Sequence, residues 1–261
     1  MVKNQSRAEN RSCGITLTGP AGKLAVDGAS CQPRGRFCMS TKDYLKYYFL
    51  EKYLFEEVSQ NFKRGYLTAH EFFAIVIWKR NASKTKIKDS LIKSSKVIEE
   101  FTGRIFENEG DPSKQLGLLT GKTGIKQVGV SIASAILTVC YPSEFTVVDY
   151  RAFNSLIKLL DEKRFSGVKN KLPQKLATYI DKYRKRKSGG KPDNVNDITE
   201  DVYFQYVEVC KKLAESFGFP LRKFDRILFG KDFYDGDGGL KWLVDKYENE
   251  IAVKRKEIMP L

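Results

Sequence analysis

The stretch that most constrains the fold is Ile125 to Phe153, "IKQVGVSIASAILTVCYPSEFTVVDYRAF". It contains a glycine between two valines, a run rich in small residues, a Pro-Ser break, a short apolar run and a single aspartate. This order predicts a tight turn through Gly129 and a helix that begins at Ser131. Asp149 then leads directly into another helix, either as its N-cap or as a carboxylate placed at a helix end for chemistry.

A pair of helices joined by a turn at Gly129 can bind an anion. We expect the first helix to end near Gly124 or Ile125 and the second to follow at once. The first backbone N–H groups of a helix lack intrahelical acceptors, so they form a ready anion site. A DNA phosphate fits such a site, and contacts of this kind hold the nucleic-acid backbone without reading its sequence.

The rest of the chain is patterned for helices. Apolar residues recur at spacings of three and four, and Thr68 with Glu71 has the spacing of a capping box. "FTVV" is too short to build a sheet. We therefore expect an all-α fold, with helices in two lobes around the segment above. The expected helices span Ser40 to Gly65, Thr68 onward, Thr85 to Phe101, Asp111-Pro112 onward, 150–161, 200–217, Pro220 onward and Leu240 to Lys256.

Composition divides the chain into two parts. Residues 1–40 are rich in Gly, Ser, Arg and Asn without any period, which is typical of a disordered or loosely attached tail. Residues 41–261 carry the helical pattern. Within them, 162–197 is a basic insertion, with a short helix expected from Leu172 to Tyr183 and a Ser-Gly-Gly loop after it.

Charge and cysteine content limit the classes of function. The 261 residues carry a net charge of +14, which suits a polyanionic partner, with nucleic acid first and an anionic membrane second. No apolar run approaches the roughly 20 residues that span a bilayer, and no secretory signal is present, so we expect no membrane association. The five cysteines form no CxxC pair, which favours free thiols in a reducing compartment, the cytoplasm or nucleus. No metal motif is present.

The segment resembles the helix-hairpin-helix of the DNA glycosylase superfamily, which includes 8-oxoguanine DNA glycosylase, adenine glycosylase and endonuclease III. The resemblance rests on the hairpin from Ile125 to Leu137, the loop with Pro142, and Asp149, which follows Gly129 by twenty residues. Flanking segments are similar to uncharacterised proteins assigned to the 8-oxoguanine glycosylase fold: "GYLTAHEFFAIVIWKR" before and "YVEVCKKLAESFGFPLRKFDRILF" after. The resemblance implies duplex DNA as partner and base removal assisted by Asp149.

Three departures from that family change the expected chemistry. Members that also cleave the strand carry a lysine early in the second hairpin helix, and Ser131 stands there, so imine formation through this position is disfavoured. The usual turn has two glycines, and Gln127 replaces the first. The four-cysteine cluster of endonuclease III is missing from the C-terminal region, so we expect no iron–sulfur centre and no other cofactor.

Candidate site residues follow from the segment and its resemblance. Asp149 is the catalytic candidate, and a capping role is compatible with it. The base pocket candidates are Trp78 and Lys79, although Trp78 also suits the core. Lys182 to Lys187, "KYRKRK", suits either phosphate contacts or a solvated loop. Solvated surface charge is the alternative for Lys122 and Lys126, and pairing with a nearby carboxylate is the alternative for Arg151. The DNA-binding candidates are Lys122, Lys126, Gln127, Gly129, Ser131 and Arg151.

The sequence favours a monomeric DNA-binding protein that resembles a monofunctional N-glycosylase of base-excision repair, a hydrolase of the N-glycosidic bond of an extruded base. The alternative is a non-catalytic helix-hairpin-helix nucleic-acid-binding module. A third interpretation is an interaction protein whose basic charge is incidental.

Overall fold

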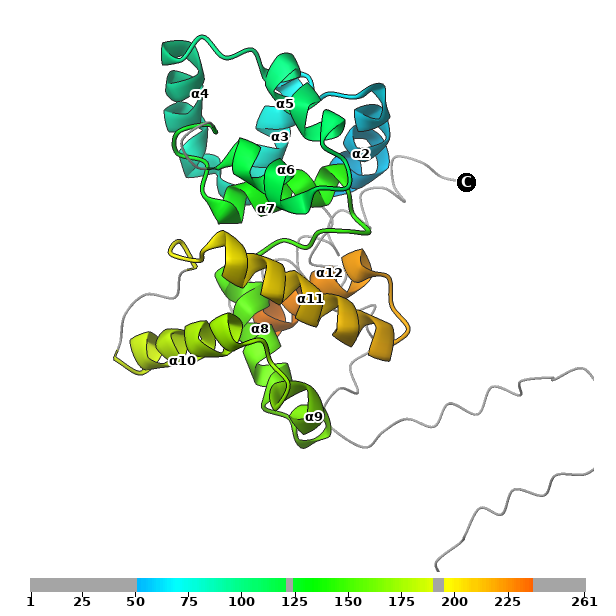
Figure 1. The fold of residues 1–261 in the computed structure, drawn as a ribbon, viewed down its shortest axis with the longest axis vertical. Coiled ribbons are helices and arrows are strands. Elements are labelled where there is room, and N and C mark those ends of the chain that lie inside the picture. Colours follow the sequence, from blue (N-terminus) through cyan, green and yellow to red (C-terminus); the bar gives the residue numbers. More distant parts are fainter. Residues whose placement is uncertain (1–50, 121–123, 190–194, 237–261) are drawn as a thin grey trace, which may run out of the picture. The chain divides into compact units, whose positions relative to one another are not determined.

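The computed structural model describes residues 51–120, 124–189 and 195–236, with side chains to Asp232 (Figure 1). These residues form helices joined by short loops, and no strand occurs among them, which confirms the all-α prediction for the described part. Three parts of the sequence predictions lie outside the described residues: the expected helix from Leu240 to Lys256, everything before Glu51, and the DNA-binding candidate Lys122. The helices of eight residues or more are α3 (Ala69–Arg80), α4 (Lys84–Lys93), α5 (Ile98–Glu107), α6 (Pro112–Leu119), α7 (Val130–Cys140), α8 (Tyr150–Leu160), α10 (Gln174–Ser188), α11 (Glu200–Ser216) and α12 (Leu221–Gly236).

The first described turns show how local chemistry sets helix limits. The chain passes through a π-helical turn η2 (Tyr53–Val58), α2 (Ser59–Asn61) and a 3-10 turn η3 (Phe62–Arg64). Gly65 ends this run with φ 97°, a conformation that glycine adopts without steric cost. Thr68 then caps α3, and Thr68 and Glu71 form both hydrogen bonds of the predicted capping box.

The helix predicted from Thr85 to Phe101 is wrong, because the structure breaks it into α4 and α5. At the break, the hydroxyl of Ser94 donates to the carbonyls of Ser90 and Leu91. Ser95 adopts φ 49° and sends the chain in a new direction. Serine hydroxyls compete for helix carbonyls, so adjacent serines end a helix that the apolar spacing alone would continue.

The C-terminal helices surround α8. This helix packs against α12, while α10 packs against α11, and α11 also contacts α12. The shorter η5 (Lys163–Phe165) and α9 (Ser166–Lys169) lead from α8 to α10. The helix predicted from Leu172 to Tyr183 continues to Ser188, so the basic run Lys182 to Lys187 is helical and not a loop. Its buried side chains Tyr179 and Tyr183 pack edge-on against Phe153 of α8.

The apolar run Phe145 to Val148 is a buried extended segment without a strand partner among the described residues. Side chains satisfy its backbone groups instead. The hydroxyls of Tyr203 and Tyr206 on α11 donate to the carbonyls of Thr146 and Val147, at 3.1 and 3.3 Å. From α7, Ser134 Oγ accepts the N–H of Val148 at 3.1 Å. Since unpaired backbone groups are costly in a core, these side chains fix the segment that leads into Asp149.

The two described cysteines, Cys140 on α7 and Cys210 on α11, are buried free thiols, as predicted. Burial raises the pKa of the Cys210 thiol to about 12 and raises that of Cys140 as well. Both thiols therefore stay protonated at neutral pH and act as small apolar side chains.

Candidate functional site

The connection between α6 and α7 contains a tight turn at Ile125 to Val128. The N–H of Val128 donates to the carbonyl of Ile125 at 2.9 Å, and Gln127 has φ 79°. A positive φ at the third position is what a type II turn requires, and glycine is the residue that adopts it most readily. Gln127 thus occupies a backbone position suited to the glycine that the family pattern has there. Its side chain, like that of Lys126, is exposed.

Gly124 allows the chain to fold back at the end of α6. A β-carbon placed on Gly124 would lie 2.1 Å from the carbonyl oxygen of Thr120, which no real side chain can do. The ammonium group of Lys96 donates to the carbonyl of Gly124 at 2.6 Å. This lysine therefore ties the loop after α4 to the start of the turn.

The N-terminus of α7 follows the turn directly. Gly129 is the N-cap residue, with an extended backbone and no side-chain cap, and it is exposed. The helix therefore begins at Val130, one residue before the predicted start. Its ladder begins with the N–H groups of Ile132 and Ala133, which both donate to the Gly129 carbonyl at 3.0 Å. The N–H groups of the residues just before Ile132, from Gly129 onward, have no acceptor in this ladder, and groups in this position bind anions at helix ends.

Asp149 is the N-cap of α8, as one of its two predicted roles requires. Its Oδ1 accepts the N–H of Ala152 at 2.8 Å. The side chain is 20% exposed, so the carboxylate is neither sealed in the core nor free on the surface. Its second oxygen, Oδ2, faces away from the cap and toward α3.

Lys79 from the last turn of α3 meets that second oxygen. Its Nζ lies 3.3 Å from Asp149 Oδ2 and 3.1 Å from the carbonyl oxygen of Val148. The lysine side chain is only 8% exposed, and burial lowers its pKa while the Asp149 carboxylate acts in the opposite direction. The carboxylate of Asp149 thus favours the charged form of an ammonium group that burial disfavours.

Ser131 completes the arrangement from α7. Its hydroxyl donates to the same Val148 carbonyl at 2.9 Å. The Val148 carbonyl oxygen therefore accepts two hydrogen bonds, from the Ser131 hydroxyl in the first turn of α7 and from the Lys79 ammonium group at the end of α3. This carbonyl belongs to the residue just before Asp149, the N-cap of α8. We name Lys79, Ser131, Val148 and Asp149 the carboxylate cluster. The cluster places the exposed turn at Gly129 close to Asp149 in space, although twenty residues separate them in sequence.

The remaining candidates lie at the edge of this cluster. Arg151 is 16% exposed, stacks over the Tyr150 ring and lies 4.0 Å from Asp232. Trp78 packs edge-on against Phe55, and the Arg222 guanidinium lies above both rings. Trp78 and Phe55 are both half-buried, so these contacts place Trp78 in an aromatic and cationic cluster outside the buried core, and its role as a base-stacking platform stays a prediction.

The sequence did not predict that Lys79 and Ser131 share the Val148 carbonyl, or that Ser134 accepts the Val148 N–H. The pair Lys79 and Asp149 lies seventy residues apart, and no local spacing connects them. The sequence signal that could have found them is that each polar residue directly follows an apolar run, "IVIW" for Lys79 and "FTVV" for Asp149.

The chain matches no protein-family model, no curated protein and no solved structure. The arrangement must therefore be interpreted from its own geometry. Within the described residues, no group of three or more His, Cys, Asp or Glu side chains could hold a metal ion. None of the described helices is long and apolar enough to cross a bilayer.

Proposed function

We propose that this protein binds duplex DNA through the turn at Gln127 to Gly129 and the N-terminus of α7, and presents Asp149 to an extruded nucleotide. In this proposal, the protein is a monofunctional N-glycosylase. The Asp149 carboxylate stabilises the positive charge that develops on the sugar as the base leaves and orients the attacking water. The product is an abasic site in an unbroken strand.

The observation that carries the proposal is the shared Val148 carbonyl. Ser131, at the helix end that suits a phosphate, donates to this carbonyl, and Lys79 donates both to it and to the carboxylate that suits a sugar cation. The ammonium group of Lys79 fixes the orientation of Oδ2, and the cap hydrogen bond from the N–H of Ala152 fixes that of Oδ1. A carboxylate held in this way needs no reorganisation when charge develops nearby.

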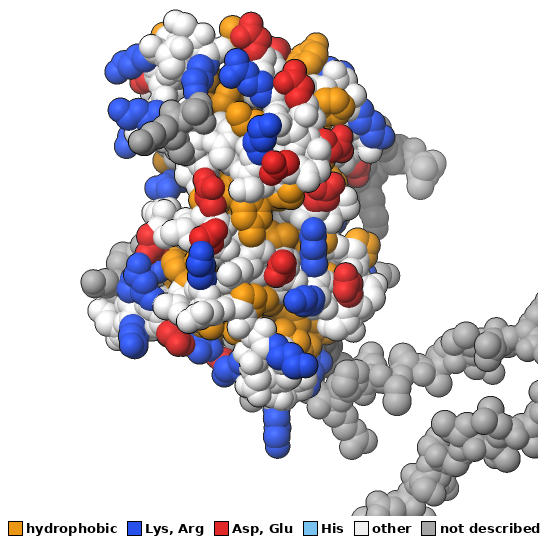
Figure 2. Space-filling model, in the orientation of Figure 1, with side chains coloured by type: hydrophobic (Ala, Val, Ile, Leu, Met, Phe, Trp, Pro, Cys, Tyr) orange, Lys and Arg blue, Asp and Glu red, His pale blue; other side chains and the backbone are white. Residues whose placement is uncertain are grey.

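Positive charge gathers near the turn. Lys126 is exposed on the turn itself, and Lys96 binds the Gly124 carbonyl. Figure 2 shows lysine and arginine side chains over α4, the helix just before Lys96. Elsewhere on that face, basic and acidic side chains alternate. The lysines of α4 are Lys84, Lys86, Lys88 and Lys93. Such a distribution suits phosphate binding at this end of the protein more than a charge spread evenly over the surface.

The rival function, a DNA-binding module without catalysis, is favoured by one specific observation. Both oxygens of Asp149 already have partners, Ala152 and Lys79, so the carboxylate could serve structure alone. A catalytic role requires the Asp149 carboxylate to contact the sugar of the extruded nucleotide while these two hydrogen bonds persist.

A base-release assay separates the two functions. The protein is incubated with duplexes that carry 8-oxoguanine, uracil, hypoxanthine or an alkylated base, and alkali then converts abasic sites into strand breaks. We expect breaks only after alkali, and none with Asp149→Asn, which keeps the cap acceptor but not the charge. DNA binding without base release from any substrate would support the rival, and absence of DNA binding would refute both.

A further inference from the structure

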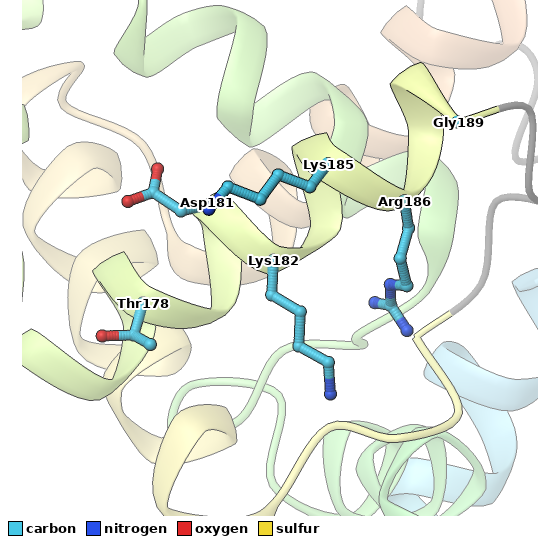
Figure 3. A pocket seen from close by; sticks show the side chains of 6 residues that line it. All are labelled: Thr178, Asp181, Lys182, Lys185, Arg186 and Gly189. Carbon is cyan, nitrogen blue, oxygen red and sulfur yellow. The ribbon is translucent and has the colours of Figure 1, made fainter.

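A shallow, open groove lies on α10, outside the carboxylate cluster. Its volume is about 600 Å³, and it follows one side of the helix from Thr178 to Gly189, which is about 16 Å at the helical rise. Figure 3 shows Lys182 and Arg186 on the same side of the helix, with their cationic tips apart. The lining residues are Thr178, Asp181, Lys182, Lys185, Arg186 and Gly189.

The cations of the groove are held in place by one carboxylate. Asp197 lies in the loop before α11, and its Oδ2 accepts from Lys182 and Arg186, both at 2.9 Å. Its other oxygen accepts from the hydroxyl of Tyr179 at 2.9 Å. Hydrogen bonds to Asp197 thus fix the direction of two long cationic side chains, which lowers the entropy that a bound anion would have to remove.

Lys185 supplies charge that no acidic side chain among the described residues neutralises. Its side chain is exposed and makes no ion pair with any described residue. Asp181 also lines the groove, but its carboxylate lies 3.7 Å from Arg184. The lining side chains therefore include three cations, Lys182, Lys185 and Arg186, and one carboxylate, that of Asp181. Asp197, which contacts two of the cations, is the second acidic side chain. The groove is net positive.

Two separate contacts join the groove to the carboxylate cluster. Asn196, next to Asp197, accepts from Arg80 at 3.4 Å, and Arg80 follows Lys79 directly. Phe153 in the first turn of α8 packs against Tyr179 and Tyr183, whose helix carries the groove. The groove and Asp149 therefore lie on adjoining parts of the protein.

We propose that this groove is a second DNA-binding surface, in which Lys182, Lys185 and Arg186 hold phosphodiester groups of the duplex whose target strand the turn at Gly129 binds. The inference rests on the function proposed above. About 16 Å of helix corresponds to roughly five nucleotides at 3.4 Å each, so the groove suits two or more consecutive phosphates. Contacts to phosphodiester groups carry no sequence information, so we expect this binding to be independent of sequence.

Salt-dependent binding tests the groove. Affinity for a plain 20-base-pair duplex is measured by fluorescence anisotropy from 50 to 300 mM KCl for wild type and the double variant Lys182→Gln with Lys185→Gln. The amide introduced by Lys182→Gln can still donate to Asp197, so the loop before α11 stays tied to α10. We expect the slope of log affinity against log salt to become shallower by about 0.9 for each phosphate that the variant no longer neutralises. Affinity at 100 mM should fall about five-fold or more for each such phosphate.

A variant with the same change in net charge is the matched control. Lys63→Gln with Lys212→Gln removes two exposed lysines outside the groove and the turn, and should keep the wild-type slope. Lys185 has no ion pair among the described residues, so Lys185→Glu alone should leave the fold intact. It should weaken binding further than Lys185→Gln. If the groove variant matches the control while Lys126→Gln weakens binding, the groove inference is refuted and the proposed function stands. If wild type does not bind the duplex, both fail.

Discussion

At the scale of single residues, Asp149 performs two structural tasks with its two oxygens. Oδ1 caps α8 and Oδ2 faces the ammonium group of Lys79. The tasks can be separated because asparagine also accepts a cap hydrogen bond but carries no charge. The stability of variants at this position therefore reports the ion pair apart from the cap.

We expect a coupling between Lys79 and Asp149 that exposed pairs do not show. Asp149→Asn leaves an ammonium that is only 8% exposed without its counter-charge, which should cost about 2 kcal/mol of unfolding free energy. Lys79→Met should cost about 1 kcal/mol, since Ser131 still donates to Val148 and Asp149 retains access to water. The double variant should cost less than the sum by about 1 kcal/mol or more.

Urea unfolding of the four proteins measures this coupling. Lys175 and Asp201 provide the matched control, because their side chains are 60% and 65% exposed. Their coupling should be about 0.3 kcal/mol or less. Additive costs for Lys79 and Asp149 would mean that the two groups do not stabilise each other.

At the scale of elements, the sequence predicts helix starts better than helix ends. Thr68 and Asp149 cap helices as predicted, and Asp111 and Thr199 cap two further helices, because capping is local chemistry that short spacings contain. The break between α4 and α5 was not predictable from apolar spacing, which continues through it. The meeting of Lys79 with Asp149 depends on how α3 packs against α7, and that packing has no pattern in the local sequence.

The turn between α6 and α7 gives a test of its backbone geometry. Gly124→Ala places a β-carbon 2.1 Å from the Thr120 carbonyl oxygen and 2.6 Å from that of Leu119. The backbone must shift, so we expect a loss of about 2–3 kcal/mol in unfolding free energy and weaker DNA binding. Gly117→Ala is the matched control within α6, because nothing lies within 4 Å of its added carbon.

The control should change stability in the opposite direction. Alanine in a helix interior is favoured over glycine by about 0.5–1 kcal/mol, so Gly117→Ala should stabilise the protein and leave DNA binding unchanged. Thermal melts and anisotropy titrations of both variants measure these effects. Equal stability for the two alanine variants would contradict the backbone contact at Gly124.

At the scale of the whole molecule, the net charge of +14 is an incomplete guide to the binding surface. Many cations of α10 have acidic partners from other elements: Lys175 with Asp201, Lys182 and Arg186 with Asp197, and Arg184 with Asp161. The sequence shows the basic run but not these partners, which come from distant loops. Composition therefore predicts a class of partner, while only the packing shows that Asp197 orients two of these cations and that Lys185 has no ion pair among the described residues.

Acid should weaken the described fold partly through Asp197. Partial burial disfavours its charge, but hydrogen bonds from Lys182, Arg186 and Tyr179 prevail and hold its pKa at about 2, against an ordinary value of 3.8. The unfolded chain therefore binds more protons between these values, so this contribution to stability is present above about pH 4 and is lost as pH falls toward 2. Because the side chain is 37% exposed, we expect about 1 kcal/mol rather than the full value of the shift.

Asp197→Asn isolates that contribution by urea unfolding at several pH values. The variant should be less stable than wild type by about 1 kcal/mol from pH 5 to 7, and the difference should shrink as pH falls from 4 toward 2. Asp181→Asn is the matched control, since that side chain is 68% exposed and has one ion pair at 3.7 Å, so its difference should stay near zero throughout. A difference for Asp197→Asn that does not change with pH would show that the destabilisation comes from packing of the loop before α11 and not from the carboxylate charge that orients the groove.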